Sequence, residues 1–258
     1  MPFADLSEAR IHYSLTGSGG GPALVFSHSV GADLSMWNAQ TAAFADRRVL
    51  RFDTRGHGQS SSPPGPYSIE RLAKDVLELL NSLKLDKVDF CGLSLGGQIG
   101  QWLGLNAPTR LHKLVLCNTG SKIGNEEGWN ARIDTVLAKG MKEIAPAVIG
   151  RWFTPQFIET NPAQVGATRA ALEATDPQGY VACCAAVRDF DARAEIAKLR
   201  VPTLVITGAH DPATPPADGR FIADQVSGAR YAELDAAHIS NIEARERFNH
   251  EVGSFLAA

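Results

Sequence analysis

Short apolar segments alternate with segments of helical periodicity along most of this chain, and that alternation constrains the fold more than any other feature. In the first half it predicts strands at residues 23–27, 49–53, 88–91 and 111–118 and helices at residues 36–45, 68–84 and 97–106. Residues 3–6 and 11–16 precede them and are predicted to form a β-hairpin. Continuous apolar strands separated by helices are typical of a parallel sheet that is covered by helices on both faces.

The alternation is interrupted once, in the middle of the chain. Residues 120–193 are predicted to be helical, with prolines between the helices and no strand pattern. Strands at residues 203–208 and 230–234 and helices at residues 218–226 and 243–256 then follow. The predicted fold class is therefore α/β, with a mostly parallel sheet of eight strands, helices on both faces and a helical cap inserted after the sixth strand. Residues 1–119 and 194–258 would form the core, and residues 120–193 the cap.

The composition limits the partners and the compartment of this protein. The chain has 258 residues, with 25 Lys and Arg against 28 Asp and Glu, so its formal net charge is −3. This near balance argues against a nucleic-acid partner, which normally requires a strongly basic face. No apolar run is long enough to span a membrane, the first residues lack the apolar core of a signal peptide, and the four cysteines are not at metal-ligand spacing. We therefore expect a cytoplasmic protein without a bound metal, and the sequence predicts no oligomeric state.

Residues Gly92–Gly96, Gly-Leu-Ser-Leu-Gly, lie between a predicted strand and a predicted helix. A G-x-S-x-G motif in this context places its serine on a sharp strand-to-helix turn, where the residues two positions away must be as small as glycine. The turn raises the hydroxyl of Ser94 above the carboxyl edge of the sheet, at the amino end of a helix that favours negative charge. Ser94 is therefore predicted to be the nucleophile of an acyl-transfer reaction.

A serine nucleophile needs a base that takes its proton and an acid that orients the base. In this arrangement the acid and the histidine follow the serine, at the ends of later strands. Asp211 follows the strand at 203–208 and His238 follows the strand at 230–234, so we predict Asp211 as the acid and His238 as the base. Asp235 is the alternative acid, but it ends the histidine's own strand and is interpreted as a turn residue.

Acyl transfer also requires an oxyanion hole, which is normally built from two backbone N–H groups. The first is predicted at Leu95, the residue after the nucleophile, and the second at Val30, in the loop that follows the strand at 23–27. His28 begins that loop and His57 lies in a glycine-rich turn. We expect both histidines to order loops rather than to transfer protons.

Together these motifs resemble those of the α/β-hydrolase family over essentially the whole chain. The resemblance rests on the Gly92–Gly97 turn, on the sequence Asp-Thr-Arg-Gly-His-Gly-Gln-Ser at residues 53–60, and on the order of Ser94, Asp211 and His238. The oxyanion loop of the family usually reads His-Gly-x, whereas Ser29 replaces that glycine here. Within the family, the chain is most similar to the 3-oxoadipate enol-lactonases, in the Ser29 loop and in residues 151–155, 179–189 and 236–243.

Similarity to the enol-lactonases implies hydrolysis of 3-oxoadipate enol-lactone to 3-oxoadipate, in the β-ketoadipate pathway of aromatic catabolism, through an acyl-enzyme and without a cofactor. The expected partner is thus a small lactone. This lactone carries a carboxylate, so an arginine of the cap would help to orient it. Arg132 is the preferred candidate, with Arg151 and Arg188 as alternatives, and Trp129 and Trp152 are expected to form an apolar wall.

Other functions stay open at this point. A carboxylesterase, a carbon–carbon bond hydrolase or a perhydrolase would use the same three residues, because one triad serves many substrates. A receptor or signalling protein of the same fold would keep the triad and turn over very slowly. Ser94 argues against the dehalogenases and epoxide hydrolases of this fold, which use an aspartate nucleophile.

Overall fold

Eight strands form a single sheet in the computed structural model, which describes residues 2–258. The strand order is β1-β2-β4-β3-β5-β6-β7-β8. β2 pairs with β1 and with β4 in antiparallel fashion, and every other neighbouring pair is parallel. The strands are β1 (Phe3–Asp5), β2 (Arg10–Thr16), β3 (Ala23–Ser27), β4 (Val49–Phe52), β5 (Val88–Leu93), β6 (Leu111–Cys117), β7 (Thr203–Gly208) and β8 (Arg230–Leu234). The prediction of eight mostly parallel strands is confirmed.

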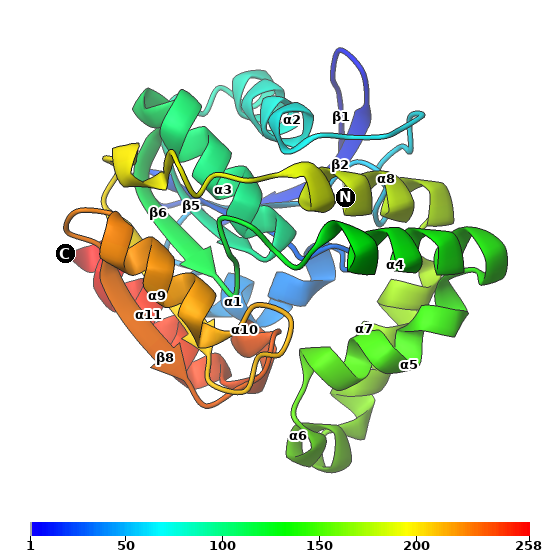
Figure 1. Cartoon of the computed structure of the whole chain (residues 1–258). Helices are drawn as coiled ribbons and strands as arrows, with labels where there is room; N and C mark the ends of the chain where they lie inside the picture. Colours follow the sequence, from blue (N-terminus) through cyan, green and yellow to red (C-terminus); the bar gives the residue numbers. More distant parts are fainter. Residues whose placement is uncertain (1) are drawn as a thin grey trace.

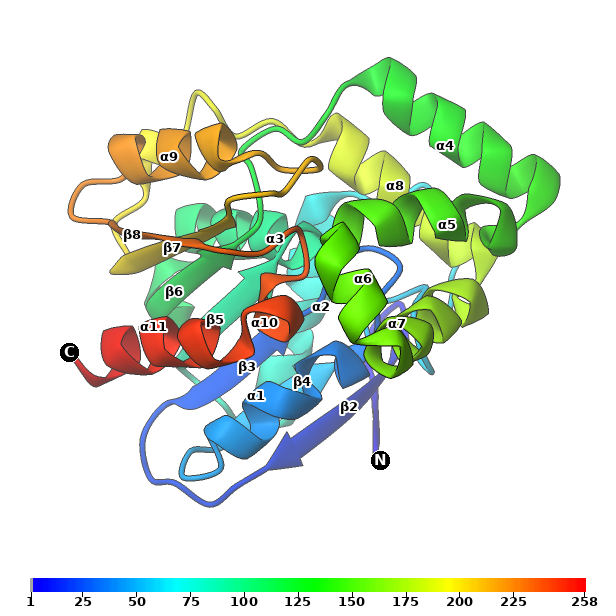
Figure 2. The same cartoon turned by 90° about the horizontal axis from the view of Figure 1, so that it is seen from below.

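Helices cover both faces of this sheet (Figures 1 and 2). α1 (Asn38–Ala43) and α11 (Arg245–Ala257) pack together on one face, whereas α2 (Ile69–Ser82), α3 (Leu95–Asn106) and α9 (Pro216–Gln225) lie on the other. β3 and β5, at the centre of the sheet, are buried along their whole length. This burial on both faces explains why β3 is almost wholly apolar and why β5 is apolar apart from Asp89, whose buried carboxylate pairs with Arg47.

Five helices follow β6 before the chain returns to the sheet at β7. They are α4 (Glu126–Lys139), α5 (Met141–Trp152), α6 (Pro155–Thr160), α7 (Pro162–Ala174) and α8 (Pro177–Asp189). α4 packs against α5 and α8, and α5 packs against α7, so the five helices form one group, the cap (Figure 2). Tyr180 of α8 lies against Gly31, just beyond the carboxyl end of β3, which places the cap over the edge where the predicted site residues lie. A helical cap after the sixth strand is thus confirmed, while its bounds at residues 120 and 193 stay a prediction.

The helices differ from the prediction at two places. In place of the single helix predicted at 36–45, the chain forms a 3-10 helix, Leu34–Trp37, and then α1. The 3-10 helix begins before residue 36 because the side chain of Asp33 accepts a hydrogen bond from the N–H of Ser35. The predicted helix at 243–256 corresponds to α11, and the short helix α10 (Ser240–Glu243), which precedes it, was not predicted. Within residues 2–258, no helix is both long and apolar enough to cross a lipid bilayer.

Candidate active site

Ser94 occupies a strained turn between β5, which ends at Leu93, and α3, which begins at Leu95. Its φ angle is 58°, in a region that residues other than glycine rarely adopt. The turn closes because its flanking glycines leave no room for a side chain. A Cβ at Gly92 would lie 2.0 Å from the carbonyl oxygen of Gly96, and one at Gly96 would lie 2.2 Å from that of Ser27. Ser94 is thereby held at the carboxyl edge of the sheet, as its motif predicts.

Asp211 and His238 form a buried pair beyond the ends of β7 and β8. The Nδ1 of His238 lies 2.8 Å from the Oδ2 of Asp211, and the two side chains are 3% and 0% exposed. Burial alone would raise the pKa of Asp211, but the charge and hydrogen bond of His238, with donors from Asn118 and Thr214, outweigh it and lower the pKa to about 2. The acid is therefore ionised at neutral pH and orients the imidazole.

Asp235, the alternative acid, lies elsewhere. Its carboxylate is almost fully exposed and contacts the Nε2 of His210 at 2.7 Å, away from His238. This pair lies at the surface, which agrees with its interpretation as a turn.

Ser94 and His238 line one cavity of about 570 Å³, between the sheet edge and the cap. Their side chains make no hydrogen bond to each other within residues 2–258. Hydrogen bonds between a nucleophile and its base are often loose in the free enzyme and tighten with substrate, so this separation leaves the roles of both residues intact. Among residues 2–258, no three His, Cys, Asp or Glu side chains are grouped so that they could hold a metal ion.

The two predicted oxyanion donors are buried and face no competing acceptor. Leu95 occupies the first position of α3, where an N–H group has no partner within its helix. Val30 lines the cavity beside Ser94, and neither its N–H nor that of Leu95 donates a hydrogen bond within residues 2–258. Ser29, which replaces the usual glycine, lines the cavity too, and its buried hydroxyl has no hydrogen-bond partner in the described chain.

Two buried histidines support this oxyanion loop. The Nε2 of His57 accepts the N–H of Gly31 at 2.8 Å, and the Nε2 of His28 accepts the N–H of Thr54 at 2.9 Å. An imidazole nitrogen accepts only when it carries no proton, so both rings are neutral. Burial lowers the pKa of both, and that of His57, next to His28, falls to about 3. Both histidines therefore hold loops in place, in line with their interpretation from the sequence.

Of the predicted substrate-binding residues, the structure brings Arg132, Trp129 and Trp152 to the cavity that contains Ser94. The guanidinium of Arg132 lies 4.8 Å from the centre of the Trp129 ring, and Trp129 donates its indole N–H to the carbonyl of Ile123 at 2.8 Å. Arg132 makes no ion pair with any carboxylate of residues 2–258. Arg151 lines the same cavity, but it is exposed.

Arg188 is not at this cavity, so the structure does not support its prediction as a substrate-binding residue. Its guanidinium binds both carboxylate oxygens of Asp189, at 2.7 and 2.9 Å, and the side-chain oxygen of Asn130 at 2.7 Å. Arg188 lies in the last turn of α8, beyond its run of buried residues, and it is engaged by these two partners.

Sequence reasoning missed Asn118, which follows β6. Its side-chain N–H₂ donates to the Oδ2 of Asp211 at 3.0 Å and to the carbonyl of Ala237 at 3.2 Å, and its oxygen accepts the hydroxyl of Ser240 at 2.6 Å. Asn118 thus links the acid to the residue before His238. Its position was the available signal, because a polar residue directly after a buried parallel strand lies at the edge where Ser94 lies.

Known proteins resemble this chain over almost its full length. The sequence profile of the alpha/beta hydrolase fold matches residues 22–181. The chain is 42% identical to 3-oxoadipate enol-lactonase 2 of Acinetobacter baylyi, over 96% of this chain and 94% of that protein. It is 38% identical to 3-oxoadipate enol-lactonase 1 of the same organism, over 94% and 91%. The crystal structure of the enol-lactonase from Burkholderia xenovorans LB400 matches with a TM-score of 0.98 and 44% identity, over 100% of both chains. The chain therefore belongs to the alpha/beta hydrolase family, as its serine turn and its alternation of strands and helices predicted.

Proposed function

We propose that this hydrolase opens 3-oxoadipate enol-lactone to 3-oxoadipate, with Ser94 as nucleophile, His238 as base and Asp211 as the group that orients the base. One observation carries the proposal: the cavity that contains Ser94 and His238 also contains Arg132, a half-buried cation without a carboxylate partner in residues 2–258. An ester-cleaving centre beside a free cation suits a small lactone that bears a carboxylate. The lactonase names of the relatives support the same substrate.

The reaction proceeds in two halves. The hydroxyl oxygen of Ser94 attacks the lactone carbonyl carbon while its proton passes to the Nε2 of His238, and the N–H groups of Leu95 and Val30 stabilise the negative oxygen that forms. The bond between the carbonyl carbon and the ring oxygen then breaks, and the ring oxygen leaves as an enol that takes the proton from His238. Both halves of the substrate stay attached to Ser94, because the ring has opened without losing an atom.

Water completes the second half. His238 takes a proton from the water as its oxygen attacks the acyl carbon, and the proton then passes to the oxygen of Ser94 as the ester bond breaks. The enol tautomerises to the ketone, which gives 3-oxoadipate. In this proposal Asp211 stays ionised throughout, the cap (residues 120–193) supplies the walls of the substrate site, and the enzyme acts in the cytoplasm on a free small molecule.

The direct test is a steady-state assay of the enol-lactone beside a neutral aryl ester. We expect kcat/KM to favour the lactone by orders of magnitude, because only the lactone offers a carboxylate to the cavity. Similar or faster turnover of the aryl ester would leave a general esterase and refute the lactonase proposal.

Replacement of the nucleophile tests the chemistry itself. Ser94→Ala should lower kcat by roughly 10⁴-fold or more, since the base and the acid cannot act without the serine oxygen. Ser35→Ala is the matched control, because Ser35 is exposed and lies outside the cavity of Ser94. Activity of Ser94→Ala at the level of this control would show that another group is the nucleophile.

A further inference from the structure

Glu243 ends α10, five residues after His238, and its carboxylate contacts two separate segments of the chain. The Oε2 accepts the N–H of Ala237 at 2.8 Å. The Oε1 accepts the N–H of Thr154 at 3.1 Å and also the hydroxyl of Thr154. Thr154 is the N-cap residue of α6 in the cap, and its hydroxyl oxygen in turn accepts the N–H of Phe157 at 3.2 Å. One carboxylate therefore joins the residue before His238 to the start of a cap helix.

A second contact joins the same two segments on the other side of the histidine. The N–H of Ile239 donates to the carbonyl of Trp152 at 3.0 Å. Both neighbours of His238 are thus bound to the cap segment Trp152–Thr154, one directly and one through Glu243. Trp152 itself lines the cavity of Ser94, so this segment contributes to the substrate site as well.

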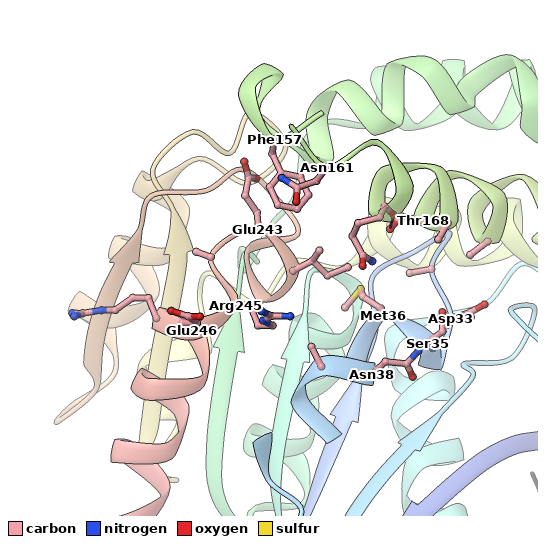
Figure 3. Close-up of a pocket in the computed structure, with 18 residues that line it drawn as sticks. Asp33, Ser35, Met36, Asn38, Phe157, Asn161, Thr168, Glu243, Arg245 and Glu246 are labelled. Atoms are coloured by element: carbon pink, nitrogen blue, oxygen red, sulfur yellow. Dashed lines mark hydrogen bonds between the residues drawn. The ribbon is translucent and has the colours of Figure 1, made fainter. Parts of the chain in front are cut away.

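Glu243 lies at the boundary between the cap and the core. Glu243 lines a separate cavity of about 710 Å³ between α6 and α7 of the cap and α1 and α10 of the core. Figure 3 shows Glu243 at the cap end of that cavity, beside Phe157 and Asn161, with Met36 and Arg245 on the core side. The carboxylate of Glu243 therefore bridges cap and core at the border of this cavity, where Phe153 of the cap segment and Ile239 of the histidine loop are both buried in the apolar core.

We infer that Glu243 is a positioning residue, which fixes the backbone of the His238 loop and the cap segment Trp152–Thr154 as one unit. Through it, the base and the Trp152 wall keep a constant separation. The inference rests on the proposed function to the extent that His238 acts there as the base. It concerns a residue that touches neither the reacting atoms nor the cavity of Ser94.

The test compares Glu243→Ala with a matched control, Glu78→Ala. Glu78 also accepts a backbone N–H and a hydroxyl from one residue, Ser7, at 2.8 and 2.9 Å, but it lies on α2 outside the cavity of Ser94. The main readout is the rate at which a fluorophosphonate labels the serine, because this reaction needs Ser94 and His238 but not the natural substrate. We expect about a tenfold or larger loss for Glu243→Ala and less than a twofold change for Glu78→Ala. With the aryl ester, kcat should fall more than KM rises.

Two substitutions at the other end of the link keep the inference falsifiable if Glu243→Ala folds poorly. Thr154→Val removes the hydroxyl that donates a hydrogen bond to Glu243, whereas Thr154→Ser keeps that hydroxyl. The labelling rate should fall in Thr154→Val and stay near that of the unaltered protein in Thr154→Ser. The combined variant Glu243→Ala with Thr154→Val should be labelled no more slowly than Glu243→Ala alone, because both changes break the same link.

Wild-type labelling in both folded Glu243→Ala and Thr154→Val would overturn the inference, as would losses that simply multiply in the combined variant. Failure of the proposed function looks different. The unaltered protein would then label normally and cleave the aryl ester, but it would not prefer the enol-lactone, whatever the variants at Glu243 and Thr154 do.

Discussion

Replacement of Arg132 by methionine should weaken the reaction with the anionic lactone and spare the reaction with a neutral ester. Arg132 is half-buried on α4, lines the cavity of Ser94, and lies 4.8 Å from the centre of the Trp129 ring. The stacked ring holds the guanidinium in one place, so little conformational entropy is lost when a carboxylate binds it. Arg132→Met keeps an unbranched side chain against Trp129 and removes only the charge and the donors.

The size of the effect follows from this partly shielded position. Two unit charges about 4 Å apart attract by about 4 kcal/mol at an effective dielectric constant of about 20. Loss of water from both groups offsets part of this energy, and hydrogen bonds to charged groups contribute about 1.5–3 kcal/mol net. About 2 kcal/mol corresponds to a roughly 30-fold loss in kcat/KM for the lactone.

The assay measures kcat/KM of both substrates for the unaltered enzyme, Arg132→Met and Arg188→Met. Arg188→Met is the control, because Arg188 is already paired with Asp189 and does not line the cavity. We expect the ratio of lactone to ester activity to fall only in Arg132→Met. An equal loss on both substrates would mean that Arg132 supports the fold of the cap. If Arg132→Met loses activity on neither substrate, Arg151→Met is measured too, and a selective loss of lactone activity there would move the carboxylate site to Arg151.

Two further predictions concern stability. The pKa of His57 is about 3 in the folded chain against an ordinary value of 6.5, so below pH 6.5 the unfolded chain binds a proton that the folded chain does not. This group should therefore lower the free energy of unfolding by up to about 1.4 kcal/mol for each unit by which the pH falls. Urea unfolding at pH 7, 6 and 5 measures this dependence, and the free energy of unfolding should change less with pH in His57→Gln. The same pH dependence in both proteins would contradict the conclusion that His57 is neutral in the folded chain. Gly96→Ala should destabilise by about 2 kcal/mol or more, because its Cβ would lie 2.2 Å from the Ser27 carbonyl oxygen. Gly166→Ala, where a Cβ meets nothing within 4 Å in α7, should raise the melting temperature, and equal melting temperatures for the two variants would contradict the steric argument.

The sheet could be predicted because its signal is local. The run at 203–208 coincides with β7, since a parallel strand that is buried on both faces is apolar along most of its length. The run at 230–234 coincides with β8, which lies at the sheet edge and is only partly buried. The 3-10 turn at Leu34–Trp37 and the short helix α10 could not be predicted in the same way. The first depends on the side chain of Asp33, and the second ends at Glu243, whose carboxylate contacts Thr154, a residue distant in sequence.

The placement of Ser94, Asp211 and His238 followed from topology rather than from side-chain detail. Each residue lies just beyond a strand of one parallel sheet, and parallel strands end at a common edge, so strand assignment alone brings the three together. Asn118 satisfies the same condition after β6. It was not predicted because the triad motif contains only the nucleophile, the base and the acid, whereas Asn118 holds the acid and the histidine loop in place.

No comparable rule exists for the cap, because its helices bury side chains against one another as well as against the core. The contact between α4 and α8 decides which arginine reaches the cavity. Arg188 of α8 binds the side chain of Asn130 on α4. Arg132 of α4 also lies near α8, because its charge lowers the pKa of Tyr180 against the larger effect of burial, and it lines the cavity of Ser94. The packing of α4 against α8 thus places both arginines, and the sequence of either helix alone does not contain this information.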